Sequence, residues 1–158
     1  MTLSMILATD NNGGIGINNA LPWEHSKEDM AWFIRNTRGK AVVMGSKTWE
    51  SLPKKPLPNR KNLILTNSNN YSDYQISVDD LMKMDEDVVV IGGASVYDLL
   101  FPKVSVIHLT IFDAEYNCDT FFDVQSRIKS DTRKWQLQSE EKINNLTFQT
   151  WVTNENVY

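Results

Sequence analysis

Cysteine, positive charge and long apolar runs are all scarce in this chain, and each scarcity excludes a class of protein. The one cysteine, Cys118, has no partner for an intrachain disulfide, which fits a reducing compartment. The formal net charge is -4 and no basic block occurs, which argues against nucleic acid or an anionic membrane as a partner. The apolar start, residues 1–10, lacks a basic flank, so we expect a buried strand rather than a signal peptide, and no segment has the length of a membrane span.

The rest of the composition is typical of one globular domain. Hydrophobic residues make up 41% and charged residues 23% of the 158 residues, enough for a single core. We expect one domain over residues 1–158, a monomer, located in the cytoplasm (or in the host cytoplasm if the gene is viral). Neither His25 nor His108 has a cysteine or an acid at ligand spacing, so no metal site is predicted.

Short apolar runs, typical of strands buried on both faces, alternate with helical patterns along the chain. The order predicts an α/β fold with a mostly parallel sheet and an antiparallel edge formed by a C-terminal hairpin. Ligands of such sheets bind at the carboxyl ends of the strands. Strands are predicted at 3–9, 40–45, 61–66, 87–93, 104–112, 133–140 and 146–153, helices at 26–37, 46–52, 78–85 and 94–101, and a polar surface loop at 66–75.

The stretch "SKEDMAWFIRN" places two acids, Glu28 and Asp29, directly before an aromatic run. Ser26 is a good helix N-cap, and the spacing from Ser26 to Asp29 fits a capping box. On spacing alone, a capping role is the simpler interpretation of Asp29, because an acid in the first turn stabilises the helix dipole.

Helical phase favours a second interpretation of Asp29. At about 100° per residue, Met30, Phe33 and Ile34 share the buried side, and Asp29 lies about 40° from Phe33, at its margin. Glu28 points about 100° away and faces water. An acid held against apolar surface has a raised pKa and needs a polar partner, which a ligand could supply.

Three glycine-bearing turns resemble anion-binding loops. "DNNGGIGINN" (10–19) is too glycine-rich for a strand or helix and predicts a mobile, tightly turning loop, although it lacks the third glycine of a dinucleotide fingerprint. "VVMGSKTWESL" (42–52) passes from strand to helix beside a lysine, which suits a phosphate group or an ordinary helix start equally well. "VVVIGGASVYDLL" (88–100) puts two glycines at the mouth of a buried strand, where they permit close backbone approach or simply a tight turn.

Taken in order, "GIGINNALPW", an acid followed by "MAWF", "VVMGSKTWESL", "PLPNRKNLILT", "VIGGASVYDLL" and "HLTIFDAEYNCDTFF" resemble the dihydrofolate reductase family. The resemblance runs nearly end to end and is weakest in 67–86 and 124–145. It implies a three-layer α/β fold, with a mainly parallel eight-stranded central sheet, an antiparallel C-terminal hairpin and four flanking helices. The implied reaction is NADPH-dependent reduction of 7,8-dihydrofolate to 5,6,7,8-tetrahydrofolate, which serves thymidylate, purine and amino-acid synthesis.

The resemblance also implies roles for individual residues. Asp29 matches the family's active-site carboxylate, which binds the pterin ring and promotes its protonation, with Thr110 bonding to Asp29 and to a bridging water. Leu21 and Trp23 belong to the loop that closes over the nicotinamide, and Arg60 matches the arginine that grips the α-carboxylate of the folate glutamate. The implied substrate pocket consists of Ile6, Ala8, Asp29, Met30, Phe33, Leu52, Leu57, Arg60, Ile91 and Thr110.

For the cofactor, NADPH, the resemblance implies a larger set, including a pair of glycines that the family joins by a cis peptide. Bacterial relatives often have basic residues where this chain has Ser46 and Ser95, so Lys47 with Thr66 or Asn67 must carry more of the 2′-phosphate contact. We therefore predict a preference for NADPH over NADH by a smaller margin than usual. The implied cofactor residues are Ala8, Ile15, Gly16, Asn19, Gly45, Ser46, Lys47, Thr48, Leu65, Thr66, Asn67, Gly92, Gly93, Ala94, Ser95, Val96, Tyr97 and Thr120.

Other interpretations remain open from the sequence. The same fold could serve a reductase of another pterin or pyrimidine ring, or a nucleotide-binding module without chemistry in which Asp29 is only a helix cap. An extra residue in "PWEHSKED" keeps Glu28 as a rival of Asp29. An RNA-binding role is opposed by the acidic balance.

Overall fold

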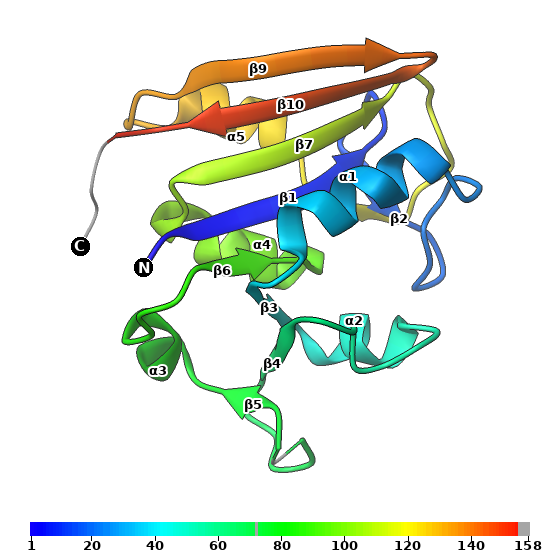
Figure 1. Cartoon of the computed structure of the whole chain (residues 1–158). Coiled ribbons are helices and arrows are strands. Elements are labelled where there is room, and N and C mark those ends of the chain that lie inside the picture. The colour runs from blue at the N-terminus through cyan, green and yellow to red at the C-terminus, as the bar shows by residue number, and fades with distance from the viewer. Residues whose placement is uncertain (72, 155–158) are drawn as a thin grey trace.

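The computed structural model describes residues 1–71 and 73–154, and its centre is an eight-stranded sheet of order β5-β4-β3-β6-β1-β7-β10-β9 (Figure 1). All neighbours pair in parallel except β10, which is antiparallel to β7 and β9. The predicted sheet is therefore confirmed. Its strands are β1 (Leu3–Thr9), β3 (Ala41–Met44), β4 (Lys61–Leu65), β5 (Gln75–Ile76), β6 (Val88–Val90), β7 (Val106–Phe112), β9 (Gln136–Ile143) and β10 (Leu146–Val152).

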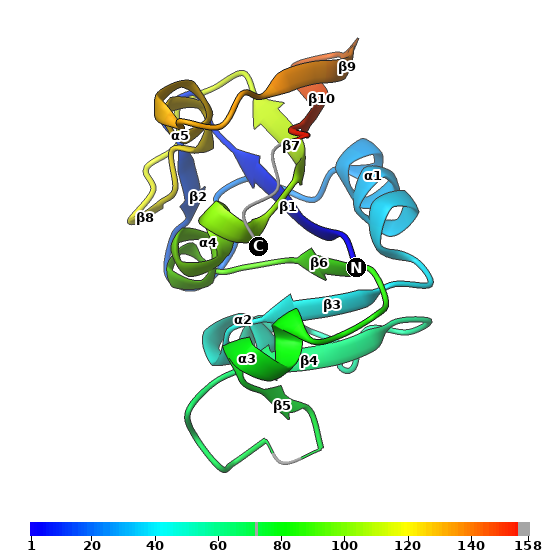
Figure 2. The same ribbon diagram turned by 90° about the vertical axis from the view of Figure 1, so that its left-hand side faces the viewer.

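Helices cover both faces of this sheet, because the side chains of its central strands are apolar on both faces and each face must be buried. Figure 2 shows α1 on one side and α4 and α5 on the other. The first four helices were predicted, whereas α5 falls where the family resemblance is weakest. The helices are α1 (Lys27–Thr37), α2 (Ser46–Ser51), α3 (Val78–Met82), α4 (Ala94–Leu100) and α5 (Val124–Ser130), with a 3₁₀ turn, η1, at Phe101–Lys103.

Two hydrophobic cores result, one on each face of the sheet. Trp32 of α1 and Trp49 of α2 pack with Phe148 of β10 in one cluster. Leu81 of α3 and Leu100 of α4 belong to the other, together with residues of α5. The other tryptophans also lie in or against these cores, Trp23 in the first cluster and Trp135 and Trp151 against the second.

A crevice is expected where β1 and β6 lie side by side. The chain leaves β1 toward α1 on one face and leaves β6 toward α4 on the other, so the two connections diverge at the carboxyl ends of neighbouring parallel strands. Such a topological switch point is the ligand site of open α/β sheets.

Some predicted boundaries were wrong. The loop at 10–19 contains a short strand, β2 (Gly14–Gly16), which pairs with β8 (Thr120–Phe121) in a separate sheet. The strand predicted at 133–140 begins at Gln136, because the residues before it are fixed by side-chain contacts rather than by sheet pairing. The polar loop predicted at 66–75 is interrupted at its end by β5, and its residue 72 lies outside the described residues.

Candidate active site

An open cavity of about 590 Å³ lies at the predicted crevice. This volume is in the range of small-molecule and cofactor sites. Every residue in the predicted cofactor set lines it except Thr66 and Asn67. The lining also includes Ala20, Leu21, Ser51 and Ile91. Ala20 and Ser51 were missed, although their places one residue after Asn19 and one helical turn after Lys47 and Thr48 could have signalled them.

Glycines form one wall of the cavity by bringing bare backbone to its surface. Gly45 N–H donates to the carbonyl of Gly92 (2.8 Å), and a Cβ on Gly45 would lie only 3.1 Å from Val96 Cγ2. Gly92 has a φ of +130°, and the peptide bond between Gly92 and Gly93 is cis, as in the family that the sequence resembles. A Cβ on either glycine would lie 3.4 Å from Thr48 Oγ1. The cradle therefore suits a ligand that approaches the main chain closely.

Lys47 is the one charged side chain among the described residues that line the cavity. Hydroxyl groups of Ser46, Thr48 and Ser95 share the same lining. This donor set, one ammonium with several hydroxyls and glycine amides, fits phosphate oxygens and contains no carboxylate that would repel them. The residues present thus fit a nicotinamide dinucleotide, with a single lysine for its phosphates.

Asp29 is held in the first turn of α1, where its backbone and its side chain have separate partners. Its N–H donates to Ser26 Oγ (3.2 Å), so Ser26 is the cap. Its carboxylate instead accepts a hydrogen bond from Thr110 Oγ1 on β7 (2.8 Å). The expected bond between Thr110 and Asp29 is present, and the carboxylate reaches across to the sheet rather than back to the helix terminus.

Burial raises the pKa of Asp29 above its ordinary value, and the hydrogen bond from Thr110 opposes that shift only in part. The negative charge of Asp29 also contributes, after burial, to a raised pKa of the Tyr97 hydroxyl. Thr110 is the register partner of Ala8 on β1, and Ala8 lines the cavity. Asp29 therefore lies one strand away from the cavity wall, although it is not itself a lining residue.

The buried side of α1 is centred differently from the prediction. Trp32 and Thr37 are its buried residues, and Met30 is 45% exposed. At about 100° per residue, the arc from Trp32 to Thr37 passes through Asp29 and Phe33. The prediction of a buried Met30 was wrong because Trp32, packed against Phe148, sets the rotation of the helix. Asp29 consequently lies within the buried arc rather than at its margin.

Glu28, the rival acid, points away from the sheet. Its side chain is exposed and lies within 3.4 Å of Ser26 Oγ at the helix start. This placement agrees with the predicted solvent-facing charge.

Several predicted substrate-pocket residues belong to the core cluster on the α1 side of the sheet or pack against it. Ile6 is buried, and Ala8, Phe33, Leu52, Leu57 and Ile91 pack against the same core cluster. Arg60 Nε donates to Thr37 Oγ1 (2.9 Å) and its Nη1 donates to Pro58 O (2.8 Å). Its guanidinium also lies 5.7 Å from the centre of the Phe33 ring. Burial and the neighbouring charge of Arg38 lower the pKa of Arg60 from its ordinary value.

Not every predicted residue lies with these groups. Trp23 stacks on Phe112 with ring centres 4.1 Å apart and lines a second hollow beside Tyr116, whereas Leu21 is 64% exposed and lines the main cavity. Thr66 Oγ1 accepts the N–H of Ser68 outside the cavity. Across the described residues, there is no helix with the length and apolarity to cross a membrane.

A glycine cradle with one lysine at a sheet switch point, one strand from a desolvated carboxylate, fits a nicotinamide-dependent oxidoreductase. The chain belongs to the dihydrofolate reductase family, whose family model matches residues 2–154. It is 34% identical over 147 residues to dihydrofolate reductase of Haemophilus influenzae, covering 89% of this chain and 88% of that protein. It is 36% identical over 134 residues to that of Neisseria meningitidis serogroup A, covering 80% and 82%.

A solved structure supports the same assignment. Dihydrofolate reductase from Enterococcus faecalis, complexed with NADP(H) and RAB-propyl, matches with a TM-score of 0.82 at 26% identity. The match covers 98% of this chain and 97% of that one. Members of the family are NADPH-dependent oxidoreductases, so the cofactor of this chain is NADPH.

Proposed function

We propose that this chain reduces 7,8-dihydrofolate to 5,6,7,8-tetrahydrofolate with NADPH, in the cytoplasm and as a monomer, and so supplies thymidylate synthesis and one-carbon metabolism. The observation that carries the proposal is the pair of Asp29 and Thr110, a desolvated carboxylate one strand from a cavity that suits NADPH. A flat apolar heterocycle with one polar edge is the ligand that such a pairing favours.

Asp29 has two tasks in this proposal. Its carboxylate accepts hydrogen bonds from the 2-amino group and the adjacent ring nitrogen of the pterin, and it promotes protonation of ring nitrogen 5 through a water. Because burial raises its pKa, the group is more basic than an exposed aspartate, which brings it closer to the range useful for proton transfer near neutral pH. Thr110 fixes the orientation of the carboxylate with a 2.8 Å hydrogen bond.

NADPH supplies the hydride when bound, and the chain supplies alignment. Gly92 and Gly93 admit the dinucleotide close to the backbone, Lys47 neutralises phosphate charge, and Ile15 with Leu21 excludes water from the nicotinamide end. At the substrate, Arg60 binds the α-carboxylate of the glutamate tail. Hydrogen bonds to Thr37 and Pro58 hold its guanidinium in place for this contact.

The decisive experiment follows absorbance at the NADPH band after addition of 7,8-dihydrofolate to the pure protein. Loss of absorbance that depends on both ligands is expected. A screen of other pterin and pyrimidine rings in the same assay separates this reaction from the related reductases.

The role of Asp29 is tested by comparing Asp29→Asn with Glu28→Gln, the matched change on the adjacent exposed acid. We expect Asp29→Asn to lower kcat by about 10²–10⁴-fold near pH 7, with partial recovery in acid, where solvent can protonate the substrate. Glu28→Gln should leave the rate unchanged. A pH-independent rate in Asp29→Asn, or an equal loss in Glu28→Gln, would falsify the assignment.

A further inference from the structure

Asp10 is a fully buried carboxylate that has no part in the chemistry above. It follows β1 directly, its exposed fraction is 0%, and no cation pairs with it among the ion pairs of residues 1–71 and 73–154. A buried charge is tolerated only when hydrogen bonds replace its hydration.

The two oxygens of Asp10 serve different parts of the chain. Oδ1 accepts the N–H groups of Asn12 and Gly14, both at 2.8 Å, within the loop that follows β1. Oδ2 accepts the N–H of Tyr116 (3.0 Å) and, more weakly, the thiol of Cys118 (3.7 Å). Burial raises the pKa of Asp10, but these hydrogen bonds outweigh it and leave the pKa below its ordinary value, so the group is charged at neutral pH.

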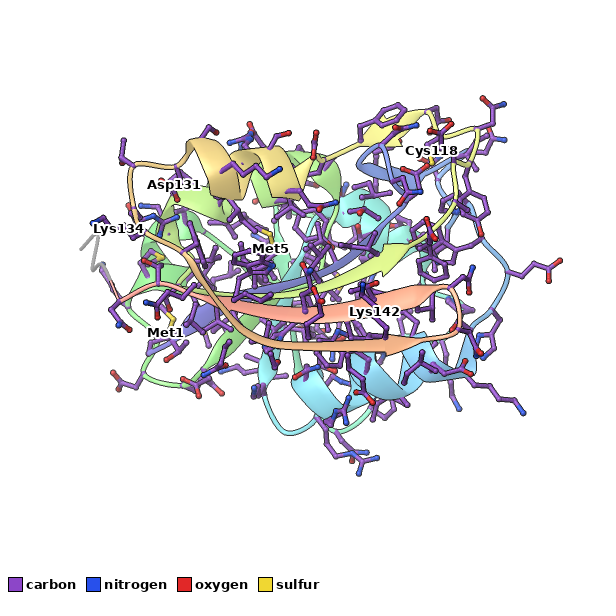
Figure 3. All side chains as sticks on the ribbon, turned by 90° about the horizontal axis from the view of Figure 1, so that it is seen from above. Met1, Met5, Cys118, Asp131, Lys134 and Lys142 are labelled. Atoms are coloured by element: carbon purple, nitrogen blue, oxygen red, sulfur yellow. The ribbon has the colours of Figure 1, made fainter. Side chains whose placement is uncertain are left out.

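The segments that Asp10 joins are residues 10–16 and 116–121, which carry β2 and β8. Packing at the junction is close, because a Cβ on Gly14 would lie 2.5 Å from Cys118 Sγ and 3.0 Å from Asp10 Oδ2. Figure 3 shows Cys118 beside the blue chain segment, at the end of the molecule opposite to Met1. The same two segments contribute Ile15, Gly16 and Thr120 to the wall of the cofactor cavity.

We propose that Asp10 is a positioning residue, whose carboxylate clamps the segment of β2 to the segment of β8 and thereby fixes one wall of the cofactor cavity. The proposal rests on the proposed function, since the effect on turnover assumes that NADPH occupies this cavity. Asp10 lies at the start of the loop 10–19. Near the end of this loop, the N–H of Asn18 donates to the exposed Asp119 (3.0 Å), which forms a second link to the segment of β8. Of these two carboxylate links, only that of Asp10 is buried.

Because each oxygen of Asp10 bonds a different segment, the substitution Asp10→Asn removes the hydrogen bonds to one segment and keeps those to the other. An asparagine can keep Oδ1 on the amides of Asn12 and Gly14, but its Nδ2 then faces the N–H of Tyr116, donor against donor. If the amide flips, it satisfies Tyr116 and opposes the other two N–H groups instead. When Oδ1 stays on the amides of Asn12 and Gly14, the variant loses the hydrogen bond to Tyr116 that joins the two segments, while the hydrogen bonds within the loop remain.

We expect the Asp10→Asn variant to bind NADPH more weakly while its affinity for dihydrofolate stays nearly unchanged. Hydrogen bonds to a charged group are strong enough that losing the bridge should weaken NADPH binding and slow hydride transfer by about tenfold to a hundredfold. Binding of dihydrofolate should change less than about twofold, because Asp29, Thr110 and Arg60 lie outside the clamped segments. A role in overall stability alone would lower the melting temperature without separating the two ligands.

The experiment measures NADPH and dihydrofolate dissociation constants by fluorescence and the hydride-transfer rate by stopped flow with NADPH and its 4-deuterated form. Asp113→Asn is the matched control. Asp113 lies just before the second segment, and its Oδ1 accepts Asn11 Nδ2 of the first (3.0 Å), but it is exposed and an asparagine can still accept there. The control should match the parent protein in all readouts.

Unchanged NADPH binding in a folded Asp10→Asn variant, or equal weakening of both ligands, overturns the proposal. Should that variant not fold, Gly14→Ala forces a methyl group toward Cys118, leaves the Asp10 charge intact, and must produce the same split. The binding measurements do not require turnover, so failure of the parent protein to reduce dihydrofolate would overturn the proposed function without deciding the role of Asp10.

Discussion

At the scale of single residues, Asp29 sets function against stability. Its pKa is raised in the folded protein, mainly by burial, so the folded state binds this proton more tightly than the unfolded chain does. Above the raised pKa, the ionised carboxylate therefore lowers the free energy of unfolding, and protonation at lower pH removes that cost.

Removing the charge should consequently stabilise the protein while it abolishes most of the activity. We expect Asp29→Asn to raise Tm at pH 7 by roughly 1–4 °C, with Thr110 still donating to the remaining side-chain oxygen. The gain should shrink as pH falls through the folded-state pKa of Asp29. Thermal melts from pH 8 down to pH 4 test this, with Glu28→Gln as the control; a lower Tm for Asp29→Asn at pH 7 would contradict it.

The lone lysine of the cavity allows a second prediction at this scale. Because Ser46 and Ser95 carry no charge, Lys47→Met should lower kcat/KM for NADPH by about tenfold, the effect of one charge-assisted contact, and reduce the NADPH preference further. Steady-state rates with NADPH and NADH measure both effects. The control is Lys54→Met, because Lys54 is exposed and lies just after α2. This variant should change neither the catalytic efficiency with NADPH nor the preference for NADPH. Equal catalytic efficiency with the two cofactors in the parent protein would contradict the expected preference.

Most cavity residues could be predicted from the sequence, because they lie in glycine-bearing loops whose spacing matches the family. Thr66 and Asn67 do not line the cavity, and the predicted burial of Met30 was wrong. Helical phase places side chains relative to one another, but the rotation of α1 against the sheet depends on how Trp32 packs, which no local pattern encodes.

At the scale of elements, side-chain contacts rather than periodicity decide where β9 begins. Arg133 is 7% exposed and donates to Val104 O (2.7 Å) and Phe101 O (3.0 Å) at the end of α4 and η1. Asp131 accepts from both Arg133 Nε (3.0 Å) and Trp135 Nε1 (2.8 Å). These hydrogen bonds hold residues 131–135 away from the sheet, so β9 begins at Gln136 and not at residue 133 as predicted.

Removing this anchor should be costly. Arg133→Met leaves the mostly buried carboxylate of Asp131 without its cation and leaves two carbonyls without their donor, so we expect a loss of roughly 3 kcal/mol in the free energy of unfolding. Urea denaturation measures the loss. Lys61→Met breaks an exposed ion pair, with side chains 60% and 48% exposed, and should cost less than about 1 kcal/mol. Equal losses in the two variants would show that burial does not decide the difference.

One element that the sequence did not predict, β2, owes its form to a distant partner. The segment of β2 is rich in glycine and has little strand propensity, yet it pairs with β8 because Asp10 and Gly14 pack against residues 116–121. The long buried strands, by contrast, were predicted close to their limits, since their apolar runs determine burial directly.

At the scale of the whole molecule, the cofactor cavity gathers residues from Ala8 to Thr120, which lie far apart in the unfolded chain. NADPH should therefore bind the folded chain alone and stabilise it by mass action. At a hundredfold excess over its dissociation constant, we expect about 2.7 kcal/mol and a Tm increase of roughly 5–10 °C. Melts across a series of NADPH concentrations measure this; Lys47→Met should require more cofactor for the same shift, and a Tm independent of NADPH would contradict the assignment of the cavity.

The antiparallel strand β10 has a consequence for synthesis on the ribosome. It covers one side of β7, whose other side is already paired with β1, and it is the last to emerge of the strands in residues 1–71 and 73–154. Until residues 146–152 leave the exit tunnel, the growing chain exposes the seven-residue, mostly apolar edge of β7 to its neighbours on a polysome. After release, the outermost position belongs to β9, whose Glu140, Glu141 and Lys142 discourage any further strand from joining.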